Sequence, residues 1–135
     1  MDRRKFTESE TMELKSSLSE REEILETISA FSNKRGGKIL VGVDPSGRIK
    51  GITVGKNTIE NLAGDIKQNT DPKVFPNITV LKINSKDVIE IFVPECPVKP
   101  VFIKDKVFIR VGKSNQKASA EKIRSFINEQ RTRYW

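Results

Sequence analysis

The chain contains no histidine and only one cysteine, Cys96, among its 135 residues. Without histidine, Ser-His-Asp and Cys-His catalysis are excluded, which leaves Asp, Glu, Lys and Tyr as the available acids and bases. A single cysteine cannot form an intramolecular disulfide, and without histidine it cannot complete one of the usual zinc sites. Any bound metal would therefore be held by oxygen ligands.

Long hydrophobic runs are also missing, since none approaches the roughly 20 apolar residues of a membrane-spanning helix. The N-terminal stretch MDRRKFTESE has basic residues but no apolar segment behind them, so it does not resemble a secretory signal. We therefore expect a cytoplasmic protein with no membrane partner. The length fits one domain. We expect a single domain over residues 1–135, with a basic aromatic tail at 130–135.

The charge that is present is mostly positive and unevenly placed. The net charge is +7 and the pI is about 9.6, which favours polyanionic partners. Residues 101–135 hold nine Lys and Arg residues against three acidic ones, whereas residues 8–26 hold seven Glu residues against Lys15 and Arg21. Such a separation is expected if carboxylates bind cations while the surrounding surface binds phosphates.

The hydrophobic pattern predicts an α+β domain with about three helices around a mixed or antiparallel sheet. We expect one helix from a capping box at residues 19–22 to Gly36 and Gly37, and a second from near Asn57 to Pro72. Ser119 is expected to cap a third. Strands are expected at 11–15, 38–43, 48–52, 78–83, 88–93, 101–103 and 107–111, with a turn at 44–47 making 48–52 a hairpin partner of 38–43.

Met12 and Leu14 are expected to face inward, so that Glu13 and Lys15 share the outer face of the first expected strand, a pattern found in many metal-dependent nucleases. The carboxylate would hold Mg²⁺ or Mn²⁺ while the ammonium faces the phosphate. Glu8 could turn back as a second ligand, and Asp44, at the end of a buried strand, could be a third. From spacing alone another interpretation is open: Glu8 is solvated, Glu13 pairs with Lys15, and Asp44 only begins its turn.

Two polar segments could grip phosphate oxygens through cationic side chains and backbone amides. One holds Lys34 and Arg35, and the other holds Arg110, Lys113 and Lys117. Simple solvation is an equally good interpretation for any one residue, but the clustering favours binding. Residues 51–58 lack the spacing of a phosphate-binding loop. We expect no zinc, haem or nucleotide cofactor.

Five segments in the same order resemble the Schlafen AlbA-like domain family, and they cover nearly the whole chain. They are the Glu-x-x-x-x-Glu-x-Lys pattern at 8–15, then 28–33 leading to Gly36 and Gly37, then 39–44, 99–102 and 109–115. The resemblance implies nucleic-acid binding, since members are commonly the N-terminal part of bacterial and archaeal regulators.

Animal Schlafen relatives include endoribonucleases that cleave tRNA and rRNA with two glutamates and an aspartate around a divalent metal. By motif, the glutamates correspond to Glu8 and Glu13, with Lys15 as the accompanying lysine, and the aspartate corresponds only approximately to Asp44. The animal proteins fuse two lobes and carry a zinc-binding group that this chain cannot build. With a single lobe here, we expect a homodimer to rebuild the two-lobed groove.

The leading hypothesis is therefore a metal-dependent endoribonuclease acting on structured RNA such as tRNA. Glu8, Glu13 and Asp44 would hold Mg²⁺ or Mn²⁺, and Lys15 would stabilise charge on the scissile phosphate. The nucleic-acid backbone, RNA in preference to DNA, would be held by Lys34, Arg35, Arg110, Lys113 and Lys117. The alternative is a non-catalytic DNA- or RNA-binding module of a transcriptional regulator.

Overall fold

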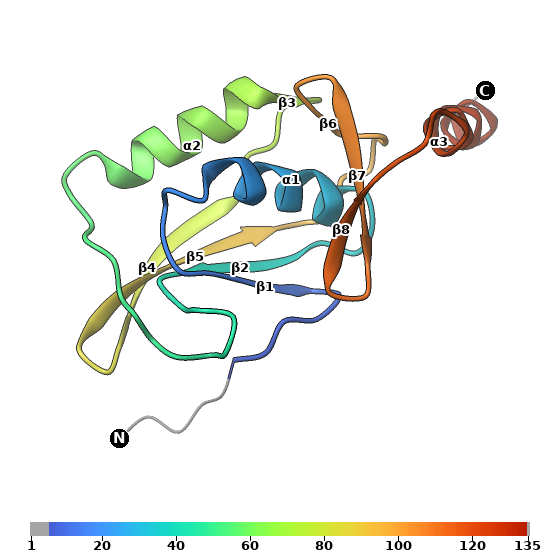
Figure 1. Cartoon of the computed structure of the whole chain (residues 1–135). Coiled ribbons are helices and arrows are strands. Elements are labelled where there is room, and N and C mark those ends of the chain that lie inside the picture. Colours follow the sequence, from blue (N-terminus) through green and yellow to red (C-terminus); the bar gives the residue numbers. More distant parts are fainter. Residues whose placement is uncertain (1–5, 135) are drawn as a thin grey trace.

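The computed structural model describes the backbone of residues 6–134 and the side chains of residues 6–131. Two four-stranded sheets are formed, with strand orders β1-β2-β5-β4 and β3-β6-β7-β8 (Figure 1). In chain order the elements are β1 (Met12–Lys15), α1 (Arg21–Ser32), β2 (Gly37–Val41), α2 (Thr58–Asn69), β3 (Thr70–Asp71), β4 (Asn77–Ile83), β5 (Lys86–Val93), β6 (Phe102–Ile103), β7 (Lys106–Val111), β8 (Ser114–Lys117) and α3 (Ala120–Tyr134).

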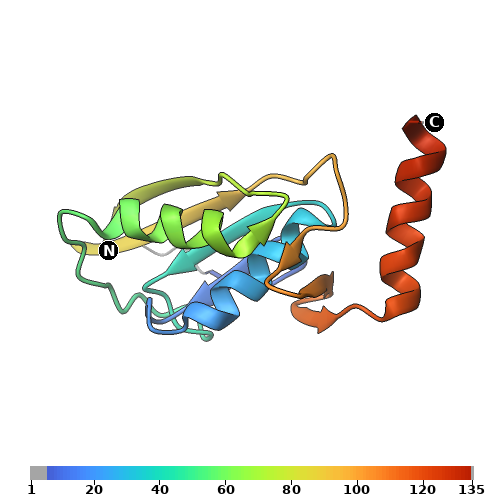
Figure 2. The same ribbon diagram turned by 90° about the horizontal axis from the view of Figure 1, so that it is seen from above.

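The first sheet is mixed, because β1 runs parallel to β2 while β2, β5 and β4 pair antiparallel. Both α1 and α2 cover the same face of this sheet (Figure 2). Ile39 and Val41 of β2 and Ile89 and Ile91 of β5 pack there against the apolar side of α1. The expected α+β domain is confirmed, although its strands form two sheets.

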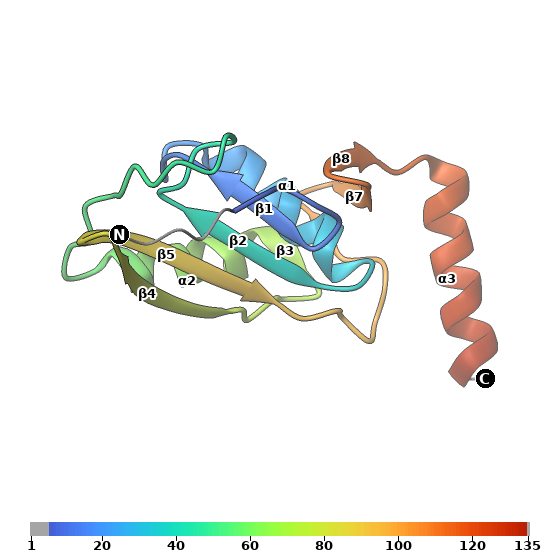
Figure 3. The ribbon, with the colours of Figure 1, turned by 90° about the horizontal axis from the view of Figure 1, so that it is seen from below.

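The opposite face of the first sheet has its own apolar cluster, built around Leu14, Leu40 and Val88. Figure 3 shows this face in front of the helices. Because both faces are covered, β2 needs apolar side chains on both, which explains its nearly continuous apolar run. None of the described helices is long and apolar enough to span a membrane.

The second sheet is antiparallel and packs against α1, while α3 projects from the rest of the molecule (Figures 2 and 3). Ser119 caps α3 as predicted, since its hydroxyl oxygen accepts a hydrogen bond from the backbone N–H of Lys122. On α3, Phe126 is buried, whereas Ile127 is exposed.

Several local predictions were wrong. Residues 48–52 form no strand, and only an isolated bridge joins Val43 to Ile49. Gly42 explains this, because its φ of +110° ends β2 and its carbonyl oxygen accepts hydrogen bonds from both Lys50 and Gly51 N–H. The returning segment therefore bends around Gly42 instead of continuing a ladder.

The predicted capping box at 19–22 is also absent. Glu20, not Ser19, is the N-cap of α1, and the Glu20 carboxylate accepts a hydrogen bond from Ser16 N–H. The helix ends at Ser32, ahead of the glycines that were expected to end it. Residues 114–117, expected as a polar loop, form β8 and complete the β7–β8 hairpin.

Candidate nucleic-acid interface

Glu13 lies in the middle of β1 and points toward α1. Its side chain is 6% exposed and both of its oxygens meet cations: Oε1 is 2.9 Å from Nη1 of Arg110, and Oε2 is 3.0 Å from Nζ of Lys15. Lys15 shares this face, as the alternation of β1 predicts, but the face is buried against α1 and is not the outer face that the sequence suggested. Nζ of Lys15 also reaches Oε2 of Glu23 on α1 at 2.6 Å. The Glu13 carboxylate is therefore neutralised within the protein.

Arg110, on β7, is fully buried. Its Nη2 donates hydrogen bonds to the carbonyl oxygens of Ser9 and Met12, and its Nη1 donates to Oδ1 of Asn115. The guanidinium also lies over the ring of Phe31, 4.9 Å from the centroid. The structure thus places Arg110 in the interior, whereas the sequence suggested a surface contact with phosphate.

The electrostatic environment of Lys15 favours its charged form. Burial alone would lower the pKa of the Lys15 ammonium, but the hydrogen bonds and negative charges of Glu23 and Glu13 outweigh burial and raise that pKa above its usual value. Lys15 therefore stays protonated at neutral pH and balances two carboxylates.

Glu8 and Asp44 also have partners within the chain. Oε2 of Glu8 accepts a hydrogen bond from Leu14 N–H at 3.2 Å. Oδ1 of Asp44 accepts hydrogen bonds from the hydroxyl and N–H of Ser46 and from Arg48 N–H. The Ser46 hydroxyl, followed by the Arg48 N–H, lowers the pKa of the Asp44 carboxyl below its usual range. Asp44 closes its own turn.

These carboxylates do not fit a divalent-metal site in the described structure. Within that part of the chain, no group of three or more His, Cys, Asp or Glu side chains could hold a metal ion. Mg²⁺ and Mn²⁺ require carboxylate oxygens that are free to coordinate. Glu13 has both oxygens in ion pairs, and Asp44 directs one oxygen into three hydrogen bonds.

The other predicted cations lie at the surface around the β7–β8 hairpin. Lys113, in the turn after Gly112, and Lys117, on β8, are exposed, and neither makes an ion pair with a described residue. Nζ of Lys34 donates a hydrogen bond to the carbonyl oxygen of Arg110 at 2.9 Å, so Lys34 adjoins the hairpin. Arg35 is next to it and exposed. Both Lys34 and Arg35 are within 3.7 Å of Oε1 of Glu10.

We call Lys34, Arg35, Lys113 and Lys117 the hairpin cation surface. The turn between β7 and β8 lies at the same end of the molecule as the start of β1 (Figure 1). This agrees with the hydrogen bonds from Arg110 to the carbonyl oxygens of Ser9 and Met12. The structure thus brings four of the five predicted phosphate contacts to one hairpin and the adjoining end of α1.

A buried polar cluster that the sequence analysis did not identify attaches the second sheet to α1. Oδ1 of Asn33 accepts a hydrogen bond from Val101 N–H, and its Nδ2 donates to the carbonyl oxygens of Val101 and Phe108. The Ser29 hydroxyl donates a hydrogen bond to the carbonyl oxygen of Val101 and accepts one from Phe108 N–H. A signal was available, because Ser29 and Asn33 are four residues apart on an otherwise apolar helix face.

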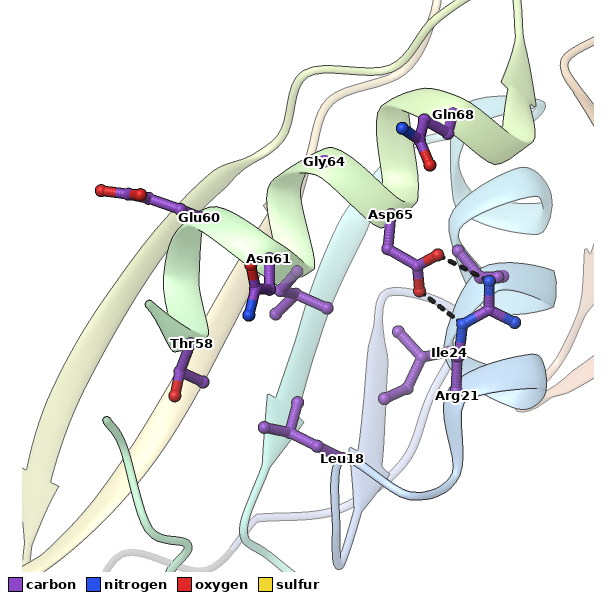
Figure 4. Close-up of a pocket in the computed structure, with 11 residues that line it drawn as sticks. Leu18, Arg21, Ile24, Thr58, Glu60, Asn61, Gly64, Asp65 and Gln68 are labelled. Carbon is purple, nitrogen blue, oxygen red and sulfur yellow. Dashed lines mark hydrogen bonds and ion pairs between the residues drawn. The ribbon is translucent and has the colours of Figure 1, made fainter. Parts of the chain in front are cut away.

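A separate hollow of about 620 Å³ lies between α1 and α2 (Figure 4). Its apolar lining includes Leu18, Ile24 and Leu62. At one side, Nε and Nη2 of Arg21 each lie 2.6 Å from a carboxylate oxygen of Asp65, which raises the pKa of Arg21. Because this ion pair satisfies both charges, the hollow offers no cation for phosphate, and we do not place nucleic acid there.

The fold and these contacts define a small α+β domain whose second sheet is attached to the first helix by buried polar side chains. The family described as Schlafen, AlbA_2 matches residues 8–119. The chain belongs to this family, which is associated with nucleic-acid binding. No curated protein matches the chain.

Solved structures with similar folds include the following two. The DIP2311 protein of Corynebacterium diphtheriae gives a TM-score of 0.69 at 20% identity, over 90% of this chain and 24% of that one. This chain therefore spans about a quarter of the length of that protein. The other structure is the N-terminal domain of a Nitrosomonas europaea protein named as related to the ATP-dependent DNA helicase RecG. It gives a TM-score of 0.61 at 25% identity, over 80% of this chain and 82% of that one.

Proposed function

We propose that this domain binds nucleic acid through the hairpin cation surface and does not cut it. The observation that carries the proposal is the pair of exposed lysines, Lys113 and Lys117, on a hairpin that Lys34 contacts through the carbonyl oxygen of Arg110. Lysines without ion-pair partners can neutralise phosphates and release their counterions. Family membership, the net charge of +7 and the likeness to a domain of a RecG-related protein support the proposal.

The acidic residues support binding without cleavage because each already has a role in the fold. Glu13 neutralises Arg110 and Lys15, Glu8 accepts the Leu14 N–H, and Asp44 closes its turn. Recruiting Glu13 to a metal would leave the guanidinium of Arg110 buried without its counter-charge, which is strongly unfavourable. The carboxylates are better explained as parts of the scaffold.

A metal-dependent endoribonuclease acting on structured RNA such as tRNA is the second candidate. One observation favours it: Glu8 approaches Leu14, so that Glu8, Glu13 and Lys15 all gather around β1. This candidate requires a rearrangement that frees the oxygens of Glu13. It also requires Asp44 to approach the two glutamates, because the described structure has no group of three such side chains that could hold a metal ion.

The binding experiment compares two double variants with equal loss of charge. Labelled tRNA and duplex DNA are titrated with the wild type, with Lys113→Gln/Lys117→Gln, and with the control Lys56→Gln/Lys67→Gln, whose exposed lysines lie just before and on α2. The proposal predicts that the hairpin variant loses affinity while the control retains it. Equal losses in both variants would show that net charge alone governs binding.

The cleavage experiment incubates the same tRNA with Mn²⁺ or with a chelator and examines its length on a denaturing gel. Glu8→Gln and Asp44→Asn are the informative variants, since Glu13→Ala would disturb the interior. Intact tRNA under all conditions supports the proposal. Cleavage that needs Mn²⁺ and is lost in both variants would select the endoribonuclease, and cleavage that persists in both would identify a contaminating nuclease.

A homodimer that rebuilds a two-lobed groove stays a proposal. Two copies would present two hairpin cation surfaces to one nucleic acid, which would raise avidity. Light scattering at micromolar concentration, with and without tRNA, tests this. A monomeric mass in both conditions would contradict it.

A further inference from the structure

The outer strand of the β7–β8 hairpin has little apolar side chain to hold it. The sequence of β8 is Ser-Asn-Gln-Lys, and only Asn115 is partly buried there. Since apolar burial normally fixes a strand against its neighbours, the position of β8 must depend on its backbone pairing with β7 and on polar contacts. Of the lysines proposed to bind phosphate, Lys117 lies on this weakly anchored strand and Lys113 lies in the turn just before it.

The polar contacts converge on one guanidinium. Arg110 joins three parts of the chain: Glu13 of β1, the carbonyl oxygens of Ser9 and Met12 before and within β1, and Asn115 of β8. Asn115 extends the connection to α1, because its Nδ2 donates a hydrogen bond to the Thr27 hydroxyl at 2.7 Å. These contacts attach β8 to both β1 and α1.

A buried ion pair is a costly way to hold two elements together, because well-packed apolar residues of similar size are often as stabilising or more so. What an Arg–carboxylate pair adds is direction, since the planar guanidinium fixes the angles of its partners. At this site, Glu13 meets the guanidinium from β1 and Asn115 meets it from β8. The geometry therefore suits orientation of one element relative to the other.

We propose that Glu13, Arg110 and Asn115 are positioning residues that orient the β7–β8 hairpin so that Lys113 and Lys117 can bind phosphates together. This inference rests on the proposed function. It gives Glu13 and Arg110 one shared role inside the protein, in place of separate roles as a metal ligand and a phosphate contact. The affinity for nucleic acid then depends on side chains that never touch it.

The test uses Arg110→Lys, which keeps the positive charge but loses the planar fork, and Asn115→Ala, which leaves the ion pair intact and so preserves the fold. The control is Val88→Ala, a core change in the apolar cluster on the opposite face of the first sheet. Amide hydrogen exchange of residues 112–117 reports the order of the hairpin. The salt dependence of binding to duplex DNA reports how many phosphates are neutralised.

Both positioning variants are expected to speed exchange at 112–117 and to weaken binding. They should also reduce the slope of log Kd against log salt by up to about 1.8, the loss of two phosphate contacts. Val88→Ala should lower the melting temperature and leave that slope unchanged. Faster exchange with unchanged affinity and slope, or unchanged exchange in both variants, would overturn the inference.

The two proposals fail in different ways. If wild-type protein shows no affinity for tRNA or DNA, or if Lys113→Gln/Lys117→Gln binds as tightly as the wild type, the proposed function fails. If that variant loses affinity but Asn115→Ala and Arg110→Lys bind like the wild type, the function stands and the positioning inference fails.

Discussion

Glu13 is the residue through which β1 is linked to both α1 and β7. One carboxylate oxygen of Glu13 forms an ion pair with Arg110, and the other forms an ion pair with Lys15. Lys15 forms a second ion pair with Glu23 on α1. Four charges therefore form a chain from the buried side of β1 to the surface of α1, where Glu23 is 59% exposed. Removing Glu13 leaves the buried guanidinium of Arg110 without a counter-charge, whereas Lys15 keeps Glu23 as its partner.

At this scale we predict that Glu13→Gln lowers the free energy of unfolding by about 3–5 kcal/mol, because Arg110 then lacks its counter-charge. Arg110→Met should also destabilise, but the double variant should cost less than the sum of the two, since no unpaired charge is left. Urea denaturation of all four proteins completes the cycle. Additive losses would argue against the ion pair.

We predict that Lys15 makes the folded protein less stable as the pH rises into the alkaline range. Its pKa is raised in the folded protein, so its contribution is fully present below the unfolded value of about 10.4 and is lost as the pH rises through the folded pKa. Lys15→Arg keeps a positive charge over this range. Melting temperatures measured from pH 8 to 11.5 should therefore fall more steeply above about pH 10 in the wild type than in Lys15→Arg. Parallel curves would refute this assignment.

The partner of Glu13 could not be predicted from local pattern. Alternation placed Glu13 and Lys15 on one face of β1, and they do pair. No local rule connects β1 to Arg110 on β7, because that contact depends on how the second sheet docks on α1. In the sequence, Arg110 lies close to Lys113 and Lys117 and therefore resembles a surface residue. Only the docking of the second sheet shows that it is buried.

Among the elements, the β4–β5 hairpin turn shows local strain that can be tested. Asn84 and Ser85 both have positive φ, 53° and 64°, as a two-residue hairpin turn requires. Serine adopts this region at a cost that glycine avoids. We predict that Ser85→Gly raises the free energy of unfolding by about 0.5–1 kcal/mol. Ser85→Ala is the matched control and should give no gain, and an equal gain from alanine would contradict the explanation.

The buried side-chain amide of Asn33 allows a test of how the second sheet docks on α1. Asn33→Leu would leave the Val101 N–H and the Phe108 carbonyl without their side-chain partner in the interior. Each such group costs about 1–3 kcal/mol, so we expect a loss of at least about 2 kcal/mol in chemical denaturation. Thr79→Leu, an exposed change on β4, is the control. A fully stable Asn33→Leu protein would show that the second sheet docks without this cluster.

The elements that could be predicted from the sequence are those whose own residues show a regular apolar pattern or a capping residue. Apolar periodicity located α1, α2, β2, β4 and β5, and Ser119 located the start of α3. β8 was missed because Ser-Asn-Gln-Lys has no apolar alternation, and its pairing depends on β7. The segment 48–52 was misjudged because the turn at 44–47 suggested a returning hairpin strand, whereas Gly42 and Gly51 adopt positive φ and prevent the ladder.

At the scale of the whole molecule, the exposed cations and the projecting helix α3 lie at the same end of the domain (Figures 1 and 2). The hairpin cation surface adjoins the start of β1, and α3 extends from β8 away from the body (Figures 1 and 2). Between α3 and the body lies a hollow of about 1020 Å³ whose lining includes Lys34, Lys99 and Arg124 beside three glutamates. Its mixed charge gives no preference for phosphate, so the exposed hairpin is the better phosphate-binding surface.

The most direct test of the central claim is the salt dependence of duplex DNA binding by the wild type and Lys113→Gln/Lys117→Gln. If the hairpin lysines neutralise phosphates, the slope of log Kd against log salt should fall by about 1.8 in the variant, about 0.9 for each lost contact. Lys56→Gln/Lys67→Gln should keep the wild-type slope. An unchanged slope in the hairpin variant would contradict the account, because phosphate would then be bound elsewhere.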